Sequence, residues 1–187
     1  MPEYFFIENG GKLILESQAY NYNLAKVNLQ YNGELQNYDN LTITTQFDWL
    51  AGKLTGNGTT TVDTTSTFTL GTSAYTQNDF TLDSQTLVNN TTANWNKRDL
   101  TLANSAQFVN NGTFNANATT TMTGGATESF VNNGYFFKKT TGTTTTMNVP
   151  FTNNGTVETV SGTLVLQQGI DNGEDAVIDL GGGTLDP

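Results

Sequence analysis

Few residues of this chain have the chemistry that catalysis or metal binding requires. The 187-residue sequence has no cysteine and no histidine, and it carries 17 acidic and 7 basic residues. This composition excludes thiol chemistry, a disulfide framework and ordinary zinc sites. A glycosidase would need two carboxylates across a cleft, but pairs such as Asp79 with Asp83 do not recur along the chain and lie in turn-like stretches. We therefore expect solvated surface charge, no cofactor and no enzymatic activity.

One acidic segment near the C-terminus has the composition of a cation site. Asp171, Glu174 and Asp175 lie in the stretch Asp-Asn-Gly-Glu-Asp, and oxygen ligands at such density suit calcium. The spacing matches neither the EF-hand loop nor the Gly-Gly-x-Gly-x-Asp repeat. These three residues are a weak candidate for a metal site, and we otherwise expect none.

Two tryptophans are the candidate ligand-binding residues. Trp49 and Trp95 are the only tryptophans of the chain. If their rings are exposed, they can stack on sugar rings as aromatic platforms. If they are buried, they fill the core. The sequence leaves both alternatives open.

Threonine-rich runs suggest a further function. They lie at 42–45, 59–61, 119–121 and 143–146. A flat array of threonines at one position in nearly every repeat would suit ice binding, but the spacing of the last two runs is out of step with the other spacings in the chain. The alternative is that threonine simply favours strands.

The charge balance argues against nucleic acid as a partner. The formal net charge is −10, and the only basic clusters are Lys97-Arg98 and Lys138-Lys139, which is far less than phosphate neutralisation requires. No apolar run is long enough to predict membrane insertion, and the N-terminus shows no export signal.

The positions of these residues depend on a repeat that runs through the second half of the chain. Its copies are Leu-Val-Asn-Asn at 87–90, Phe-Val-Asn-Asn at 108–111 and 130–133, and Phe-Thr-Asn-Asn at 151–154. Glycine follows the last three copies, at 112, 134 and 155. Self-similarity at a nearly constant period of about 21 residues indicates an array of supersecondary units.

Each unit is rich in threonine, valine and phenylalanine with frequent glycine and asparagine, which favours strands and turns. Apolar residues at helical spacing do not extend beyond one turn. The repeat predicts an all-β fold, a right-handed parallel β-helix of about eight coils of roughly 21 residues. Three short strands per coil would stack on neighbouring coils at about 4.8 Å. An antiparallel array of hairpins with Asn-Gly turns is the alternative.

Two ladders are expected to run along this solenoid. An apolar one comprises Phe47, Phe68, Leu87, Phe108, Phe130 and Phe151. A polar one comprises Asn89, Asn110, Asn132 and Asn153. A side-chain amide can donate to and accept from identical amides above and below it. We also expect these asparagines and the following glycines to form left-handed turns.

The organisation differs along the chain. Residues 1–40 are rich in tyrosine and phenylalanine, and we interpret them as an aromatic N-terminal cap with the first degenerate coils, because terminal repeats are usually atypical. Residues 41–187 form one continuous array. Its glycine-rich finish does not resemble a cap, so we expect a longer natural chain, or another copy, to continue the stack beyond Pro187.

A resemblance adds a cellular context. The pattern from Trp49 through Gly52, Leu54, Gly56 and Gly58, the FVNNGTF-like units, and the segments 149–157 and 161–164 resemble repeat modules of large bacterial cell-surface and adhesin-like proteins. The likeness covers roughly residues 45–185. It implies right-handed parallel β-helices in extracellular chains. The sequence lacks an export signal, an outer-membrane translocator and a cell-wall anchor, so we expect a fragment of a longer protein.

These observations together favour a non-catalytic structural or adhesive module that acts as a rigid rod or spacer at the cell surface. The expected partners are surface glycans or neighbouring copies that stack end to end. The alternatives are a glycan-binding or host-attachment module, such as an adhesin or a phage fibre segment, and then an ice-binding protein.

Overall fold

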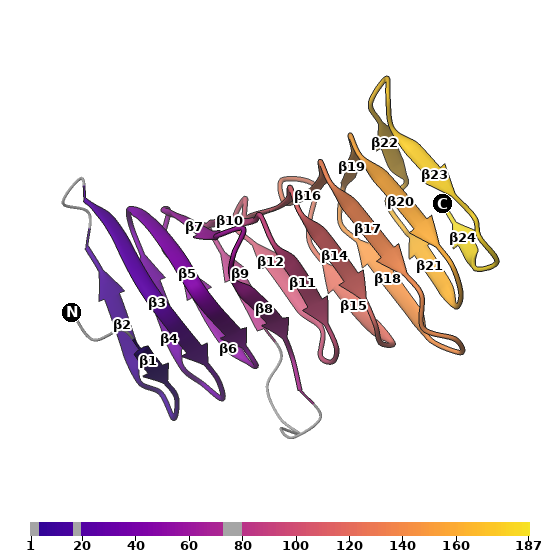
Figure 1. The fold of residues 1–187 in the computed structure, drawn as a ribbon. Coiled ribbons are helices and arrows are strands. Elements are labelled where there is room, and N and C mark those ends of the chain that lie inside the picture. Colours follow the sequence, from indigo (N-terminus) through magenta and orange to yellow (C-terminus); the bar gives the residue numbers. More distant parts are fainter. Residues whose placement is uncertain (1–3, 17–19, 73–79) are drawn as a thin grey trace.

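The chain winds into a stack of parallel strands, as the repeat predicts. The computed structural model describes residues 4–16, 20–72 and 80–187, so Asp79 lies outside the described residues. The coils follow one another from the N-terminus at one end to the C-terminus at the other (Figure 1). All described strand pairs are parallel, as in β10 (Thr86–Asn89) with β13 (Gln107–Asn110). The all-β parallel solenoid of about eight coils is confirmed, and the antiparallel hairpin alternative is wrong.

The strands form three lateral faces. Face 1 consists of the first halves of β3 (Asn21–Leu29) and β5 (Asn40–Trp49), and of β7 (Thr59–Val62), β10, β13, β16 (Ser129–Asn132), β19 (Phe151–Asn153) and β22 (Ile170–Asn172). Face 2 consists of β1 (Tyr4–Ile7), the second halves of β3 and β5, and β8 (Thr67–Leu70), β11 (Thr92–Trp95), β14 (Thr113–Ala116), β17 (Tyr135–Lys138), β20 (Thr156–Thr159) and β23 (Val177–Asp179). Face 3 consists of β2 (Lys12–Leu15), β4 (Glu34–Asn37), β6 (Gly52–Thr55), β9 (Phe80–Asp83), β12 (Leu100–Ala103), β15 (Thr120–Thr123), β18 (Thr144–Asn148), β21 (Thr163–Leu166) and β24 (Thr184–Asp186). Among the described residues there is no helix, so none of them offers a helix that could span a membrane.

The corners between faces differ in length. In four successive coils, the corner from face 1 to face 2 has two residues, at 90–91, 111–112, 133–134 and 154–155. In the same four coils, the corner from face 2 to face 3 varies from three residues at 117–119 to five at 139–143. The corner from face 3 to face 1 likewise varies, from two residues at 84–85 to five at 124–128. In these four coils, therefore, only the corner from face 1 to face 2, which follows the inner asparagine of each Asn-Asn pair, has a constant length.

Alternation along each strand separates core from surface. In β13, Phe108 and Asn110 are buried, whereas Gln107 and Val109 face outward. Successive side chains of a strand point to opposite sides, so each coil contributes about two inward side chains per strand. The core is therefore a narrow column, which is why a hydrophobic content of only 35% suffices.

The single apolar ladder expected from Phe47 to Phe151 is in fact two columns. Phe47 pairs with Phe68 on face 2, and that column continues through Ala93, Phe114, Phe136 and Val157. Leu87, Phe108, Phe130 and Phe151 form a separate column on face 1. The expectation was wrong because residues of both columns point inward, and a spacing close to one coil length does not distinguish one face from the next.

The two columns nevertheless share one core. Rings stack within a column, with 5.3 Å between the centroids of Phe108 and Phe130 and 5.4 Å between those of Phe114 and Phe136. Across columns the rings meet edge to face, as for Phe130 and Phe136 at 5.7 Å. Both arrangements suit the charge distribution of aromatic rings. The phenylalanines therefore tie face 1 to face 2 through the interior.

The strands of residues 1–40 belong to the same stack. β1 pairs with β3, and β2 pairs with β4, in the parallel register of the later coils. An aromatic cluster is present here, with 6.2 Å between the ring centroids of Tyr4 and Phe6. Both side chains are about half exposed, at 50% and 51%, and alternate with Phe5 and Ile7, which face inward. The aromatic residues of β1 thus extend along face 2.

The last coil leaves apolar side chains uncovered. Ile178 pairs with the buried Val157 and occupies an inward position, yet it is 38% exposed. Leu180 follows it and is 55% exposed. The described residues contain no further strand beside β22, β23 or β24. These strands therefore present an unpaired edge and an open end of the core.

Candidate functional site

Trp49 and Trp95 are not available as a sugar platform. Both lie in one inward column of face 2, separated by Leu70, and both are fully buried. The Nε1 of Trp95 donates to the backbone oxygen of Arg98 at 2.8 Å, and that of Trp49 donates to the oxygen of Gly52 at 3.4 Å. The two rings therefore fill the core and satisfy backbone carbonyls at the corner between faces 2 and 3.

The carboxylates of the acidic segment near the C-terminus are not gathered into a cluster of cation ligands. Asp171 lies on β22, and Glu174 and Asp175 follow in the next corner; all three side chains are exposed. No group of three or more potential metal ligands occurs among the described residues. The spacing of these carboxylates reflects a solvated turn at the end of the stack.

The four predicted asparagines lie in one buried column at the end of face 1. Asn89 donates through Nδ2 to Oδ1 of Asn110 at 2.7 Å, Asn110 to Asn132 at 2.8 Å, and Asn132 to Asn153 at 2.9 Å. The column continues to Asn172 at 3.2 Å. We call this column the inner asparagine ladder. Its amides also donate to backbone oxygens of their own corner and of the next coil, as Asn110 does to Gly112 and Tyr135.

A second row of amides runs outside the first. Asn90, Asn111, Asn133 and Asn154 are linked by side-chain hydrogen bonds of 2.9 Å at each step. We call this row the outer asparagine ladder. It lies at the surface, where exchange with water reduces the net contribution of each bond.

The backbone at these corners is not left-handed, contrary to expectation. The residues with positive φ include neither ladder and none of Gly112, Gly134 and Gly155. Glycine is required there for a different reason. A Cβ on Gly134 would lie 2.1 Å from the backbone oxygen of Gly112, and one on Gly155 would lie 2.1 Å from that of Gly134. Adjacent coils approach too closely for any side chain.

Lys138 is unusual because its charged side chain lies in the core. It occupies the same inward column as Trp95 and is fully buried. Its Nζ donates to the backbone oxygen of Ala116 at 3.3 Å and to Oγ1 of Thr143. Burial lowers the pKa of Lys138 to about 8, because an apolar environment disfavours the charged form.

Glu128 is the corresponding buried anion. Its carboxylate accepts hydrogen bonds from the backbone nitrogens of Ser105 at 2.8 Å and Gly125 at 2.6 Å, and from the hydroxyl of Thr127. The bond from Ser105 is the main reason that the pKa of Glu128 lies below its ordinary value; burial opposes the shift. Glu128 thus closes the five-residue corner at 124–128.

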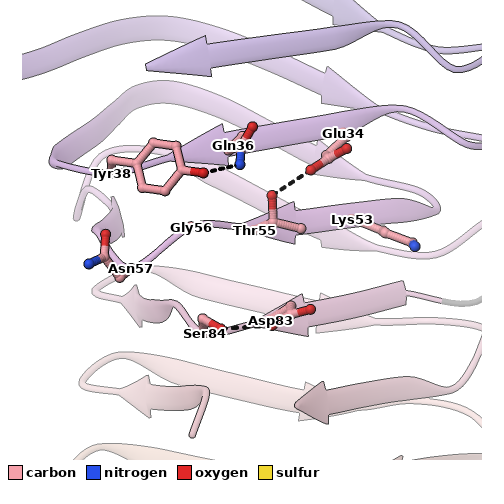
Figure 2. Close-up of a pocket in the computed structure, with 9 residues that line it drawn as sticks. All are labelled: Glu34, Gln36, Tyr38, Lys53, Thr55, Gly56, Asn57, Asp83 and Ser84. Carbon is pink, nitrogen blue, oxygen red and sulfur yellow. Dashed lines mark hydrogen bonds between the residues drawn. The ribbon is translucent and has the colours of Figure 1, made fainter. Parts of the chain in front are cut away.

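A polar groove lies on the outer side of face 3. It spans about 480 Å³ across β4, β6 and β9, and Figure 2 shows how the side chains line it. The lining residues are Glu34, Gln36, Tyr38, Lys53, Thr55, Gly56, Asn57, Asp83 and Ser84. Most of its polar groups are already paired: Thr55 donates to Glu34 at 2.6 Å, Ser84 donates to Asp83 at 2.8 Å, and Gln36 donates to Tyr38.

The carboxyl group of Glu34 differs from the proton donor of a glycosidase. Partial burial alone would raise the pKa of Glu34, but the hydrogen bond from Thr55 and the ion pair with Lys12 at 3.2 Å outweigh it and keep that pKa below its ordinary value. A catalytic acid needs a raised pKa. The carboxylate of Glu34 is therefore held in its charged form by bonds within the chain.

The threonine runs do not share one face. Thr42 pairs with Thr61 on face 1, whereas Thr121 pairs with Thr146 on face 3. The corner at 124–128 absorbs the extra residues that separate the last two runs. On face 1, the column of Thr42 and Thr61 continues into Val88, Val109 and Val131. On face 3 most strands carry an outward threonine, but these are divided among columns: Thr81, Thr101 and Thr123 form one, and Thr144, Thr163 and Thr184 form another. No single column displays threonine in nearly every described coil.

An outward-facing aromatic pair on β17, of which Tyr135 is exposed and Phe137 is half-buried, is the feature that the sequence did not predict. Tyr135 and Phe137 face outward on face 2, while Phe136 between them is buried. The alternation within Tyr-Phe-Phe-Lys could have revealed it, once β17 was recognised as a strand with one side in solvent. Only tryptophan was expected to supply an aromatic platform.

Comparisons with known proteins assign no family. Protein-family models, curated proteins and solved structures gave no match to this chain.

Proposed function

We propose that the chain is a non-catalytic structural module of a bacterial extracellular surface protein, in which it acts as a rigid rod or spacer. The observation that carries the proposal is the continuous parallel pairing of the strands of three faces around one core. The resemblance to repeat modules of cell-surface proteins supports the location. The acidic charge of the chain also suits an elongated body exposed to solvent.

The inner asparagine ladder supports stiffness in particular. Its side-chain hydrogen bonds join five successive coils from β10 to β22. Each buried amide that loses its partner costs about 1 to 3 kcal/mol, so bending or shearing one coil against the next is resisted. The module would then contribute a stiff, elongated shape to its parent protein and would not need a reactive group.

Two measurements test the proposal. Small-angle X-ray scattering should give an elongated particle, with about eight coils stacked at about 4.8 Å per coil. Antibodies raised against the folded chain should label intact bacterial cells that express the parent protein as strongly as lysed cells. Labelling that appears only after lysis would refute the surface location, and a compact scattering profile would refute the rod.

A glycan-binding module is the second candidate function. The observation that favours it is the outward-facing aromatic pair of β17, in which Tyr135 is 52% exposed and Phe137 is half-buried. Ligands would then contact a lateral face of the solenoid.

A further inference from the structure

Both ends of the stack present open strand edges. At the C-terminal end, no described strand pairs with the outer edges of β22, β23 and β24. At the N-terminal end, the same holds for β1, β2 and residues 21–24 of β3. The two ends lie at opposite extremes of the stack (Figure 1). An open edge carries backbone N–H and C=O groups that can pair with a further strand.

Apolar side chains are uncovered at both ends. Tyr4 of β1 is 50% exposed, and Val177 and Ile178 of β23 are 49% and 38% exposed. The inward side chain of Phe5 is only partly buried, whereas Phe114, which occupies the same column in an interior coil, is fully buried. The core of face 2 is therefore incomplete at each end.

The uncovered residues of β1 and β23 lie in the same columns of face 2. Through successive strand pairs, Ile178 continues the inward column that begins at Phe5, and Val177 continues the outward column that begins at Tyr4. If β1 of a second copy lay beside β23, Ile178 would meet Phe5 and Val177 would meet Tyr4. Such a contact repeats the parallel packing that joins neighbouring coils within the chain.

Charge favours the contact of unlike ends. The only charged residues of β1, β2 and β3 are Lys12 and Lys26, whereas those of β22, β23 and β24 are Asp171, Asp179 and Asp186. The described corners of each end add two carboxylates. Two C-terminal ends would therefore bring like charges together, which is costly. An N-terminal end, with lysine on its strands, suits the acidic end better.

The other two faces contribute less to this contact. On face 3, Leu185 continues the column of Thr120, whereas Leu13 lies in the different column of Leu102. On face 1, one strand would be missing at the junction, because β24 belongs to face 3 and β1 to face 2. Face 2 therefore carries the contact, and small interfaces of this kind are typically weak and transient.

We propose that the C-terminal end of one copy binds the N-terminal end of a second copy, with β1 adding in parallel to β23. Two unlike surfaces meet in this contact, and copies stacked along one axis do not close into a ring. The assemblies would therefore lengthen as the concentration rises. This inference rests on the proposed rod. Scattering from dilute monomers tests the rod by itself, so the two proposals can fail separately.

Three variants carry the same substitution at different places. Tyr4→Glu changes the N-terminal end, and Ile178→Glu changes the C-terminal end. Tyr135→Glu is the control, because Tyr135 is 52% exposed and lies in the same outward column as Tyr4, but in an interior coil. All three residues are partly exposed, so folding should be retained. Far-ultraviolet circular dichroism and melting temperature establish that each variant is folded.

Sedimentation velocity of the full chain from about 10 µM to about 1 mM measures the association, because we expect a dissociation constant below about 1 mM. The average mass of the wild type and of Tyr135→Glu should rise beyond that of a dimer. Each end variant alone should show a dissociation constant raised at least about tenfold. An equimolar mixture of the two end variants should form dimers and nothing larger, because it contains one intact end of each kind.

Three results would overturn the proposal. The first is a wild type that stays monomeric throughout the concentration range. The second is a mass that stops rising at the dimer, or an end variant that still dimerises alone as the wild type does, because like ends would then bind each other. The third is an equal loss of association in Tyr135→Glu, which would place the contact on a lateral face.

Discussion

The inner asparagine ladder shows how one residue type can hold successive coils together. Each central amide accepts from the preceding coil and donates to the next. It also donates to backbone oxygens at the corner. In a buried environment each of these bonds matters mainly because its loss leaves another polar group unpaired.

Replacing Asn110 by alanine should therefore be costly. The change leaves the amide of Asn89 and the carbonyl group of Asn132 without their ladder partner, and we expect a loss of about 3 kcal/mol in the free energy of unfolding. Asn111→Ala in the exposed outer asparagine ladder should cost less than about 1 kcal/mol. Urea unfolding of both variants measures the difference. Similar losses in the two would show that burial of the ladder does not matter.

Lys138 should make stability depend on pH in the alkaline range. Its folded pKa of about 8 lies below the ordinary value of 10.5. Between these values the unfolded chain binds more protons than the folded chain, so the free energy of unfolding rises with pH. Lys138→Met should be more stable than the wild type by about 1 to 2 kcal/mol at pH 7, after the loss of two hydrogen bonds.

The two proteins should converge in stability between pH 8 and 10.5. Thermal unfolding across this range checks the effect, and the remaining lysines and tyrosines contribute equally to both curves. Parallel curves would mean that Lys138 titrates normally.

At the scale of the element, the two-residue corners determine how closely coils stack. Gly134→Ala places a Cβ 2.1 Å from the backbone oxygen of Gly112, which neither coil can accommodate without moving. We expect a loss of more than about 3 kcal/mol. Gly142→Ala is the control: its φ of +71° disfavours alanine, but nothing lies within 4 Å, so about 1 kcal/mol is expected. Chemical denaturation measures the free energy of unfolding of both variants. Equal losses in the two variants would exclude the steric explanation.

The corner at 124–128 depends on a carboxylate. The stabilisation from Glu128 is present above its unfolded pKa near 4.5 and is lost as the pH falls through the lower folded pKa. Glu128→Gln should cost about 1 to 2 kcal/mol at pH 7, because one backbone donor then faces an amide NH₂ group. The difference from the wild type should shrink below about pH 4. Urea unfolding at several acidic pH values measures both effects. Glu174→Gln is the control variant, because the side chain of Glu174 is exposed and its replacement should leave the free energy of unfolding at pH 7 unchanged.

The architecture of these elements was largely accessible from the sequence, and the candidate site was not. The spacing of the Asn-Asn pairs from Asn89 to Asn153 matches the ladder, because both are set by the length of one coil. The apolar positions were less informative, since Phe68 and Leu87 point inward from different faces. Tryptophan at 49 and 95 resembled a ligand platform, but only the environment of a ring determines whether it is exposed.

At the scale of the whole molecule, stability should vary along the stack. Each coil contacts only its neighbours, so the terminal coils have about half of the stabilising contacts. Ile178 and Leu180 already show incomplete burial. We expect amide hydrogens of β22–β24 to exchange at least tenfold faster than those of β13–β15, because local opening costs less free energy at the end. Uniform protection, measured by hydrogen exchange with mass spectrometry, would indicate a single cooperative unit.

The corners differ in length and in their contacts with adjacent coils, so they should also differ in whether they accept an inserted peptide. A peptide epitope inserted at 140–142 should be displayed without disturbing the fold, because Gly142 has open space around it and exposed loop tips accept insertions. The same epitope at 111–112 would push apart adjacent coils that approach to backbone contact. The corner at 111–112 is therefore closed to inserted sequence, whereas the tip at 140–142 is open to it.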